Sequence, residues 1–385
     1  MKQTVYHTGL VCTGSALMDI KQEWCELSTR CIDASLHHDW YWHHALSVYL
    51  SRNIQYLTIR FGTTLIAVVP LDLTQTKSLR GPACNETPLA DMLLDPNHCT
   101  PELFTVLVQE LTRHAPQWRT LKLSNLPENS AWLTMIALVK WPSHREQSGT
   151  NAYFRNDGDE GLNPPKKLKR NLTRLHRRLT DQYGEPTLCA GDLNDYLSVN
   201  QHSWKQLNSR TGLVSDEQAR TFYESLLSSY GLSDRAWVSI MKIGDVAISA
   251  QLGLRYGRCF SLLKITYHED FAAFGVGSQH LWKALEWAQT QPLDTVNLTT
   301  GPGWADRWHP DRRPVYELCL YRKSLFGYGN YGFEKIKTRL RPLKKAIQAG
   351  IRRVHPNVST SSVHRGHHDR PVHRADAPTR CDSGS

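Results

Sequence analysis

The stretch AWVSIMKIGDVAISAQLGLRYGRCFSLLKITYHEDFAAFGVGSQHLWKALEWA, residues 236–288, decides the fold of this chain. Its first part predicts three consecutive antiparallel strands, because runs rich in β-branched and aromatic residues are separated by turns at Gly244 and Gly257. Its last part predicts an amphipathic helix over about residues 276–289. Gly275-Val276-Gly277 stands where the third strand passes into that helix.

This glycine pair predicts an anion site, with a flexible turn as the simpler alternative. A strand, a G-x-G turn and a helix bring backbone N–H groups and the positive end of the helix dipole to one point. Glycine suits such a site because a side chain would hold a phosphate away from the backbone. The dinucleotide fingerprint is excluded, because His280 stands at its third glycine and no βαβ unit precedes it; the P-loop is excluded because no Gly-Lys-Ser/Thr follows.

Composition indicates a globular protein with a substantial core. The chain has 385 residues, 40% hydrophobic and 21% charged, which is enough for two domains. Its longest apolar run, residues 65–71, is far too short to span a membrane, and residues 1–7 lack the apolar core of a signal peptide. Nine cysteines without a C-x-x-C pair favour a reduced, cytoplasmic protein over a disulfide framework or a zinc ribbon.

Two segments account for the net charge of +10. Residues 166–178 hold seven basic side chains and no acid, and residues 331–353 hold eight basic side chains and one acid. Together they carry +14, so the rest of the chain sums to −4. Each segment also has an apolar helical stripe. This pattern suits a core-packed helix with a solvated basic face, or contact with anionic lipid, nucleic acid or an acidic acceptor. Peripheral attachment to the inner face of the membrane is one expectation.

The other elements divide the chain into three parts. Up to residue 150, the patterns predict a helix at 39–51, a hairpin at 54–73, a helix at 100–115 and a strand at 118–126. The polar residues 143–165 predict an inter-domain crossing, with NAYFRN, residues 151–156, as a candidate strand within it. The third part begins with a helix at 166–183 and a helix capped by Ser215. It continues with the meander, the G-x-G helix and strands at 294–301 and 314–322. After about residue 356 the chain lacks residues for a core and should be disordered.

The order of these segments resembles the GNAT acetyltransferase fold. Residues 272–277 resemble the Q/R-x-x-G-x-G/A motif of that superfamily, with Ala272 in place of Gln or Arg. The ordered set LKRNLTRLHRRL, NQHSWKQL, FYESLLSSYG, IGDVAISAQLGLRYG and VNLTTGPGWADRW resembles the FemAB-like branch associated with cellulose biosynthesis (CelD-like). The resemblance covers about residues 30–325. It implies an α+β fold with a mixed sheet and two tandem GNAT-like halves, residues 1–150 and the better-formed acyltransferase half 151–355, before a tail at 356–385.

The resemblance also implies a reaction and a set of residues. The reaction is direct acyl transfer from acetyl-CoA or another acyl-CoA to an amine, or less often a hydroxyl, without a metal. Backbone groups of one strand would polarise the thioester carbonyl, and a base would deprotonate the acceptor. The residues implied are Ile265 and Thr266 for the strand contacts; Gly275, Val276, Gly277 and Ser278 for the pyrophosphate; Asp306 as base and Tyr267 as acid; and Trp204, Arg307 and Trp308 for the acceptor cleft. Asp306 could equally cap a loop, and each tryptophan could equally be core.

One departure from the family keeps other functions open. Trp304-Ala305 stands where relatives carry Tyr-Lys, and Asn297 stands near an acidic position. The leading prediction is a cytoplasmic acyl-CoA-dependent N-acyltransferase, an acetyltransferase acting on an envelope or polysaccharide precursor. The alternatives are a FemAB-type transferase that uses aminoacyl-tRNA, and a non-catalytic GNAT-like binding or assembly protein. The four histidines at 37, 38, 43 and 44 do not predict a metal site, because their spacing never places three on one face.

Overall fold

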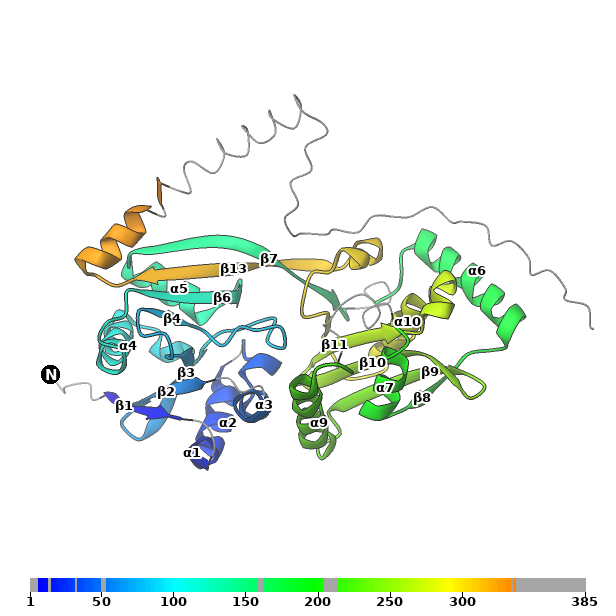
Figure 1. Ribbon diagram of the computed structural model, residues 1–385, viewed down its shortest axis with the longest axis horizontal. Helices are drawn as coiled ribbons and strands as arrows, with labels where there is room; N and C mark the ends of the chain where they lie inside the picture. The colour runs from blue at the N-terminus through cyan, green and yellow to red at the C-terminus, as the bar shows by residue number, and fades with distance from the viewer. Residues whose placement is uncertain are drawn as a thin grey trace, which may run out of the picture. The chain divides into compact units, whose positions relative to one another are not determined.

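The computed structural model describes residues 6–12, 15–31, 33–49, 53–157, 162–203, 213–333 and 335–336 (Figure 1). The chain divides into two compact units, Met1–Gly332 and Phe333–Ser385. The first unit contains one large mixed sheet. Trp204 and the tail predicted from residue 356 lie outside the described residues.

The N-terminal half of the first unit begins with a strand and helices and continues as a meander. Its elements are β1 (Tyr6–Val11), α1 (Ser15–Asp19), α2 (Lys21–Arg30), η1 (Leu36–His38), α3 (Trp40–Tyr49), β2 (Ile54–Phe61), β3 (Thr64–Asp72), β4 (Ser78–Arg80), β5 (Leu93–Leu94), η2 (Pro96–His98), α4 (Pro101–His114), β6 (Thr120–Pro127), α5 (Ala131–Val139) and β7 (Ser143–Arg155). The predicted hairpin is confirmed as β2 and β3, with its turn at Gly62 (φ 60°).

The C-terminal half has the same plan. Its elements are α6 (Lys166–Tyr183), β8 (Thr187–Ala190), α7 (Leu193–Asn200), α9 (Glu217–Gly231), β9 (Ala236–Ile243), β10 (Val246–Tyr256), β11 (Cys259–Tyr267), η3 (Glu269–Phe274), α10 (Val276–Gln289), β12 (Thr295–Asn297), η4 (Gly303–Trp308) and β13 (Asp311–Tyr321). The predicted meander and the G-x-G helix are confirmed. The predicted cap of α9 is corrected from Ser215 to Asp216, whose carboxylate accepts the N–H of Ala219.

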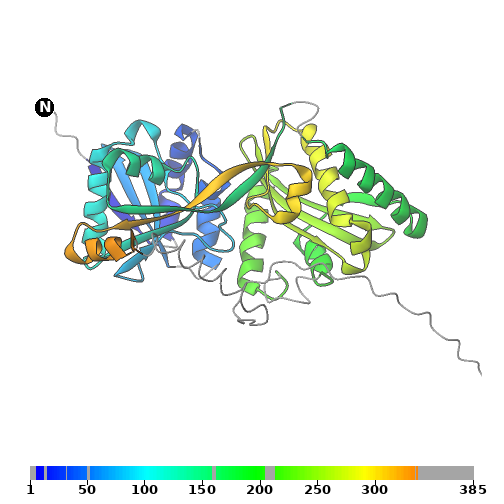
Figure 2. The same ribbon diagram turned by 90° about the horizontal axis from the view of Figure 1, so that it is seen from above.

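Both halves repeat one strand order and then exchange their last strands. In each half an antiparallel series, β1-β2-β3-β4 or β8-β9-β10-β11, ends against a parallel strand, β6 or β12. β7 of the first half then pairs with β12, and β13 of the second half pairs with β6. β7 and β13 twist around each other between them (Figure 2). The mixed α+β sheet with two tandem GNAT-like halves is therefore confirmed.

This exchange corrects the prediction of a polar crossing at 143–165. Residues 143–155 form β7, which the sequence predicted as a strand only at its end. The first part of β7 is exposed, and backbone pairing with β13 holds it in place. A strand that buries neither face carries no alternating hydrophobic pattern, so its sequence reads as a loop.

Helices cover both faces of the sheet. α2, α3, α7 and α9 share one hydrophobic cluster that joins the two halves, including Trp42, Tyr56, Phe222 and Leu252. The other face is covered by α4 and α5 in the first half, and by α6 and α10 in the second. β11 lies between these layers, so each of its side chains points either toward α10 or toward α7 and α9.

Candidate active site

β11 separates from its neighbour β12 after a short contact. The two strands pair only over Cys259–Ser261 and Thr295–Asn297. The register of β11 with β10 shifts just after this contact, which leaves Leu263 as an extra residue in β11. Such a bulge bends a strand and increases its twist. The remainder of β11, to Tyr267, is therefore not paired with β12 and forms one side of an opening in the sheet.

The N-terminus of α10 lies at the end of β11 and offers open donors. Gly275 adopts the left-handed conformation (φ 63°) and joins η3 to α10. Its carbonyl accepts the N–H groups of Ser278 (2.9 Å) and Gln279 (3.0 Å). The N–H groups of Val276 and Gly277 have no partner among the described residues, as expected for the first turn of a helix. The positive end of the helix dipole lies at the same place.

Both glycines of the turn also have packing reasons. A Cβ on Gly277 would lie 3.0 Å from Cδ1 of Tyr267, and a Cβ on Gly275 would lie 3.2 Å from Cδ1 of Leu175 in α6. Gly275 is further required by its positive φ. These contacts account for the glycines without a bound phosphate, so the anion site needs separate support.

Arg307 supplies that support. η4 places its guanidinium at the first turn of α10, where it donates to Oγ of Ser278. The side chain of Arg307 is exposed, but the protein desolvates part of its guanidinium, and this desolvation lowers the pKa of Arg307 from its usual value. No described carboxylate forms an ion pair with it. A cation without a described carboxylate partner, beside the positive end of a helix, leaves an excess of positive charge, which an anion would neutralise.

The strand residues predicted to contact the thioester lie on opposite faces of β11. Ile265 packs toward the α10 core, whereas Thr266 is buried and its Oγ1 accepts from Nδ2 of Asn200 (3.1 Å). The carbonyl of Thr266 accepts from Oγ of Ser249 (3.0 Å). Burial, and then the charge of Glu269, raise the pKa of Tyr267.

A buried histidine continues this polar chain. Nδ1 of His280 contacts Oγ of Ser249 (3.0 Å), and Nε2 contacts Oγ of Ser239 (2.9 Å). His280 is fully buried, which lowers its pKa to about 3 and keeps the ring neutral. A neutral ring donates through only one nitrogen, so the two serines take complementary roles. The chain fixes α10 against β9, β10 and β11.

η4 directs its predicted residues to different places. Asp306 is exposed and pairs with Arg312. Trp308 is buried, with 3% exposure, in the core beside Phe154. Arg307 alone of these residues reaches α10. Roles for Asp306 as base and for Trp308 in an acceptor cleft stay predictions.

Sequence reasoning missed a polar cluster on the opposite face of β11. Lys264 pairs with Oε2 of Glu86 (3.0 Å), and the hydroxyl of Tyr223 donates to the same oxygen (2.6 Å). Burial, and then the charge of Glu86, raise the pKa of Tyr223 well above its usual value. Glu86 comes from the loop after β4, in the other half of the unit. The only local signal is a lysine in the otherwise apolar run FSLLKITY.

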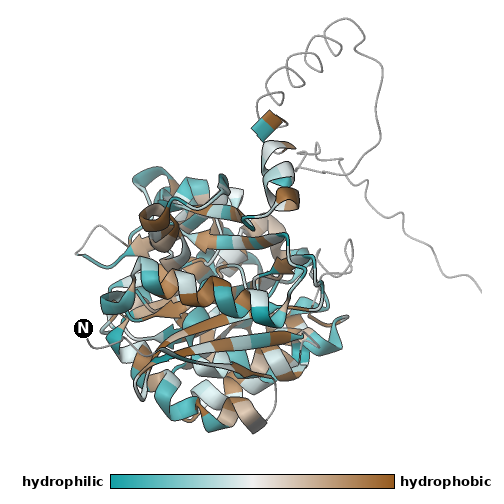
Figure 3. Ribbon diagram, turned by 90° about the vertical axis from the view of Figure 1, so that its left-hand side faces the viewer, coloured by the Kyte–Doolittle hydropathy of each residue, from teal (hydrophilic) through white to brown (hydrophobic). Residues whose placement is uncertain are grey.

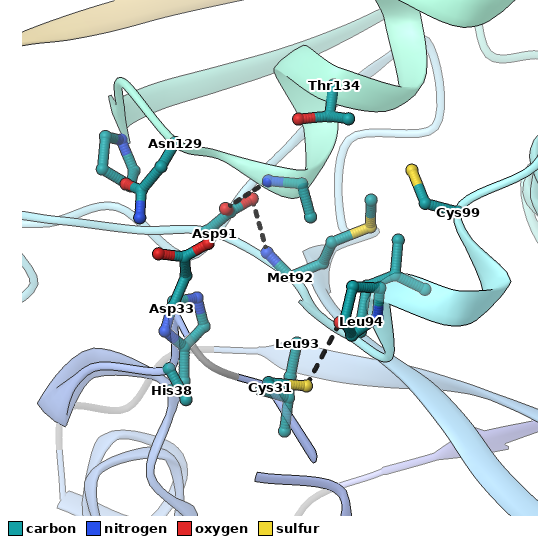
Figure 4. Close-up of a pocket in the computed structure, with 14 residues that line it drawn as sticks. Cys31, Asp33, His38, Asp91, Met92, Leu93, Leu94, Cys99, Asn129 and Thr134 are labelled. Atoms are coloured by element: carbon teal, nitrogen blue, oxygen red, sulfur yellow. Dashed lines mark hydrogen bonds between the residues drawn. The ribbon is translucent and has the colours of Figure 1, made fainter. Parts of the chain in front are cut away.

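Two adjoining pockets share part of their lining. The first, of about 240 Å³, belongs to the N-terminal half, where Asp33, His38, Asp91 and Asn129 gather at its polar end (Figure 4). Asp91 accepts the N–H groups of Met92 and Ala131, both at 2.8 Å.

The second pocket, of about 220 Å³, draws its lining from both halves, including Asn151, Asn297 and Arg313. Asp33 and His38 line both pockets. The amide nitrogen of Asn151 donates to Oδ1 of Asn297 (2.7 Å). The two pockets therefore form a region of mixed polar and apolar lining that reaches from the N-terminal half to β12.

The histidines near α3 are packing residues in the described part of the chain. His37 lies edge-on to Trp42, and His43 contacts Trp24 and Tyr56. Within the described ranges, no three His, Cys, Asp or Glu side chains are grouped as metal ligands would be. No helix in those ranges is long and apolar enough to cross a bilayer.

Comparison with known proteins agrees with the fold. Residues 166–308 match the family model described as "Acetyltransferase (GNAT) domain". No curated protein matches the chain. The structure is similar to L-PGS from Bacillus licheniformis, with a TM-score of 0.51 and 10% identity over 78% of this chain and 92% of that one.

Two further structures are similar. FemX gives a TM-score of 0.54 and 11% identity over 78% of this chain and 96% of that one. The C-terminal domain of a putative lysylphosphatidylglycerol synthetase from Agrobacterium fabrum gives a TM-score of 0.50 and 13% identity over 84% of this chain and 97% of that one. At these identities the similarity shows the fold alone. The predicted GNAT domain is thus confirmed for residues 166–308, and such a domain indicates an acyltransferase.

Proposed function

We propose that this chain is an acyl-CoA-dependent N-acyltransferase of the FemAB-like, CelD-like branch, which transfers an acetyl or other acyl group to an envelope or polysaccharide precursor. One observation supports an acyl-CoA donor: Arg307 contacts Ser278 at the start of α10, where the N–H groups of Val276 and Gly277 are open. Backbone N–H groups at a helix start bind phosphate oxygens, and an arginine contributes two parallel donors. Together they suit the diphosphate of CoA, which Ser278 would also contact.

The opening beside β11 suits the thioester end of the donor. Because β11 leaves β12 after residue 261, the backbone around Thr266 does not pair with β12. An N–H group on this edge would stabilise the negative charge that develops on the thioester oxygen. The buried chain through Ser249 and His280 holds the strand still, as catalysis by fixed dipoles requires.

The acceptor would approach from the two pockets. Asn151, Asn297 and Arg313 offer amide and guanidinium groups, which suit a polar acceptor such as a sugar or peptide precursor. Trp308 and Trp204 remain the acceptor-cleft residues proposed from the resemblance, whereas Arg307, expected there from the sequence, is proposed here for the diphosphate because it contacts Ser278.

The reaction needs one base and one acid. The acceptor nitrogen attacks the carbonyl carbon, its proton passes to a carboxylate, and the C–S bond breaks as the C–N bond forms. The leaving thiolate takes a proton, for which Tyr267 is the proposed donor. Asp306 is the base proposed from the sequence. Glu86 is a second candidate, because Lys264 fixes it beside the diverging part of β11.

Aminoacyl-tRNA is a second candidate donor, as in a FemAB-type transferase. α6 carries seven basic residues between Lys166 and Arg178, and it packs beside the N-terminus of α10 through Leu175. A basic helix next to the donor site would suit a nucleic-acid backbone, and binding would then weaken steeply with salt.

Calorimetric titration of the full chain separates these donors. Acetyl-CoA should bind, and Arg307→Met should weaken it by about 10- to 100-fold, the range expected for a lost charge-assisted hydrogen bond. Arg312→Met is the matched control, because Arg312 pairs with Asp306 and does not contact α10. Gly277→Glu should abolish binding by placing a carboxylate at the anion site.

Other outcomes would change the conclusion. Salt-sensitive binding of total tRNA without binding of acetyl-CoA would establish the second donor. Binding of neither would contradict both transferase proposals. With an acceptor amine in hand, Glu86→Gln and Asp306→Asn identify the base, because only loss of the base removes the acidic limb of the rate profile.

A further inference from the structure

An exposed apolar surface follows β13 at the edge of the first unit. Leu325, Phe326 and Tyr328 are 92%, 66% and 52% exposed, and all three lie in the helix over residues 325–333. Figure 3 shows hydrophobic and hydrophilic residues mixed along this helix. Single exposed apolar side chains are ordinary, but three within one helical turn form a patch that marks an interaction site.

The same surface carries basic side chains. The guanidinium of Arg119 stacks on the ring of Phe326 at 4.5 Å, and the ammonium of Lys323 lies 4.4 Å from the ring centre of Trp141. Arg322 donates to the carbonyl of Pro116. None of these three cations forms an ion pair with a described carboxylate.

The helix is attached firmly to the sheet. The ring of Tyr331 lies 5.4 Å from that of Tyr321, and the indole nitrogen of Trp141 donates to the carbonyl of Tyr321 at 2.8 Å. The N–H of Tyr328 donates to the carbonyl of Ser324 at 2.9 Å. The exposed side chains therefore stand on an ordered turn.

Charge decides what covers this surface. Residues 331–353 carry eight basic side chains and one acid, so covering the patch with that segment would bring like charges together. Covering the patch with the same surface of a second copy would also bring like charges together. An anionic lipid bilayer satisfies both features, because its headgroups attract the cations and its acyl boundary accepts the apolar side chains.

We propose that Leu325, Phe326 and Tyr328, with Arg119, Arg322 and Lys323, bind an anionic membrane surface. This aromatic–basic surface does not depend on the proposed function. α6 is basic too, but its apolar residues Leu168, Leu172 and Leu179 are buried in the protein. α6 can attract anionic headgroups, but these buried leucines cannot insert into the bilayer. α6 therefore cannot replace the aromatic–basic surface.

Flotation of the full chain with vesicles tests the proposal. Vesicles of equal parts phosphatidylglycerol and phosphatidylcholine should carry the protein, and pure phosphatidylcholine vesicles should not. The double variant L325E/F326E should bind about 100-fold more weakly, because two apolar side chains no longer enter the bilayer. L232E is the matched control: Leu232 is 91% exposed at the end of α9, and its replacement should leave binding unchanged.

Four outcomes would overturn the proposal. The wild-type chain could fail to float with the anionic vesicles, or L325E/F326E could bind as tightly as L232E. R174Q/R177Q, on the exposed face of α6, could remove binding while L325E/F326E keeps it. A wild-type dimer that L325E/F326E converts to a monomer without lipid would show that a second copy covers the surface. Unchanged unfolding curves for the variants exclude a folding defect.

Discussion

Acidification should destabilise this fold steeply, because four imidazoles are buried in their neutral form. Burial lowers the pKa of His280, His37 and His43 to about 3, and that of His38 to about 4, from the usual 6.5. In the unfolded chain these side chains bind protons freely below pH 6.5. The unfolded state therefore holds more protons, and stability that is present above pH 6.5 is lost as the pH falls.

The size of the effect follows from the number of buried rings. Between about pH 7 and about pH 5.5, each ring removes about 1.2 kcal/mol, so the four remove about 5 kcal/mol. Since the pKa values of all four histidines in the folded state lie below this pH range, the result does not depend on how far below it they lie.

Two buried carboxyl groups act in the opposite direction. Burial raises the pKa of Asp91 to about 7, so the native state gains a proton there and recovers at most about 1.6 kcal/mol. Hydrogen bonds from Ala131, Ser130 and Met92 favour the charged carboxylate, and the pKa of about 7 already includes them. Burial also raises the pKa of Asp39, which adds to the offset. The net loss should be about 3 kcal/mol, a large part of the stability of a typical domain.

Urea unfolding at the two pH values measures this loss. His280→Gln keeps a group that can bond to Ser239 and Ser249, and its pH-dependent loss should be about 1.2 kcal/mol smaller than that of the wild-type chain. His7→Gln changes an exposed histidine and should lose as much as the wild type. Equal stability of the wild-type chain at both pH values would refute the reasoning, as would an unchanged pH dependence in His280→Gln.

Two further predictions concern the faces of β11. Gly277→Ala should lower the unfolding free energy more in the wild-type chain than in a Tyr267→Ala background, because the new Cβ lies 3.0 Å from the Tyr267 ring. A double-mutant cycle should give a coupling of about 1 kcal/mol between the two positions. A coupling near zero would show that this contact does not constrain Gly277. Glu86→Gln should lower the unfolding free energy by about 1–3 kcal/mol, since the ammonium of Lys264 loses its carboxylate, and Lys264→Met should recover part of that loss in chemical denaturation. If Lys264→Met worsens the defect, the ion pair is not its cause.

The second half could be predicted well because its elements carry strong local signals. β9 to β11 alternate with clear glycine turns, so the three strands are predicted in their order, and the regular apolar face of α10 predicts that helix over residues 276–289. β7 could not be found in full, because backbone pairing with β13 holds it and its first part buries no side chains. Its partners lie far along the chain, as with Asn151 and Arg313, and no local pattern encodes such a pairing.

The same distinction applies to the site. The start of α10 is local and was predicted from two glycines, whereas Glu86 meets Tyr223 across 137 residues and leaves no pattern in the sequence. Arg307 was predicted for the acceptor cleft, and the structure places it against Ser278 of α10. A sequence assigns residue types to a region, and only the fold decides which of them meet.

The glycine turn shows why the choice of donor rests on Arg307. Gly275 is needed for its backbone conformation, and Tyr267 packs where a side chain on Gly277 would lie. A chain that had lost its donor would keep both glycines for these reasons alone. It would have no comparable reason to keep an arginine without a described carboxylate partner at the positive end of a helix, where the charge of the arginine is unfavourable. The cation therefore favours an anionic ligand at α10 more strongly than the G-x-G pattern does.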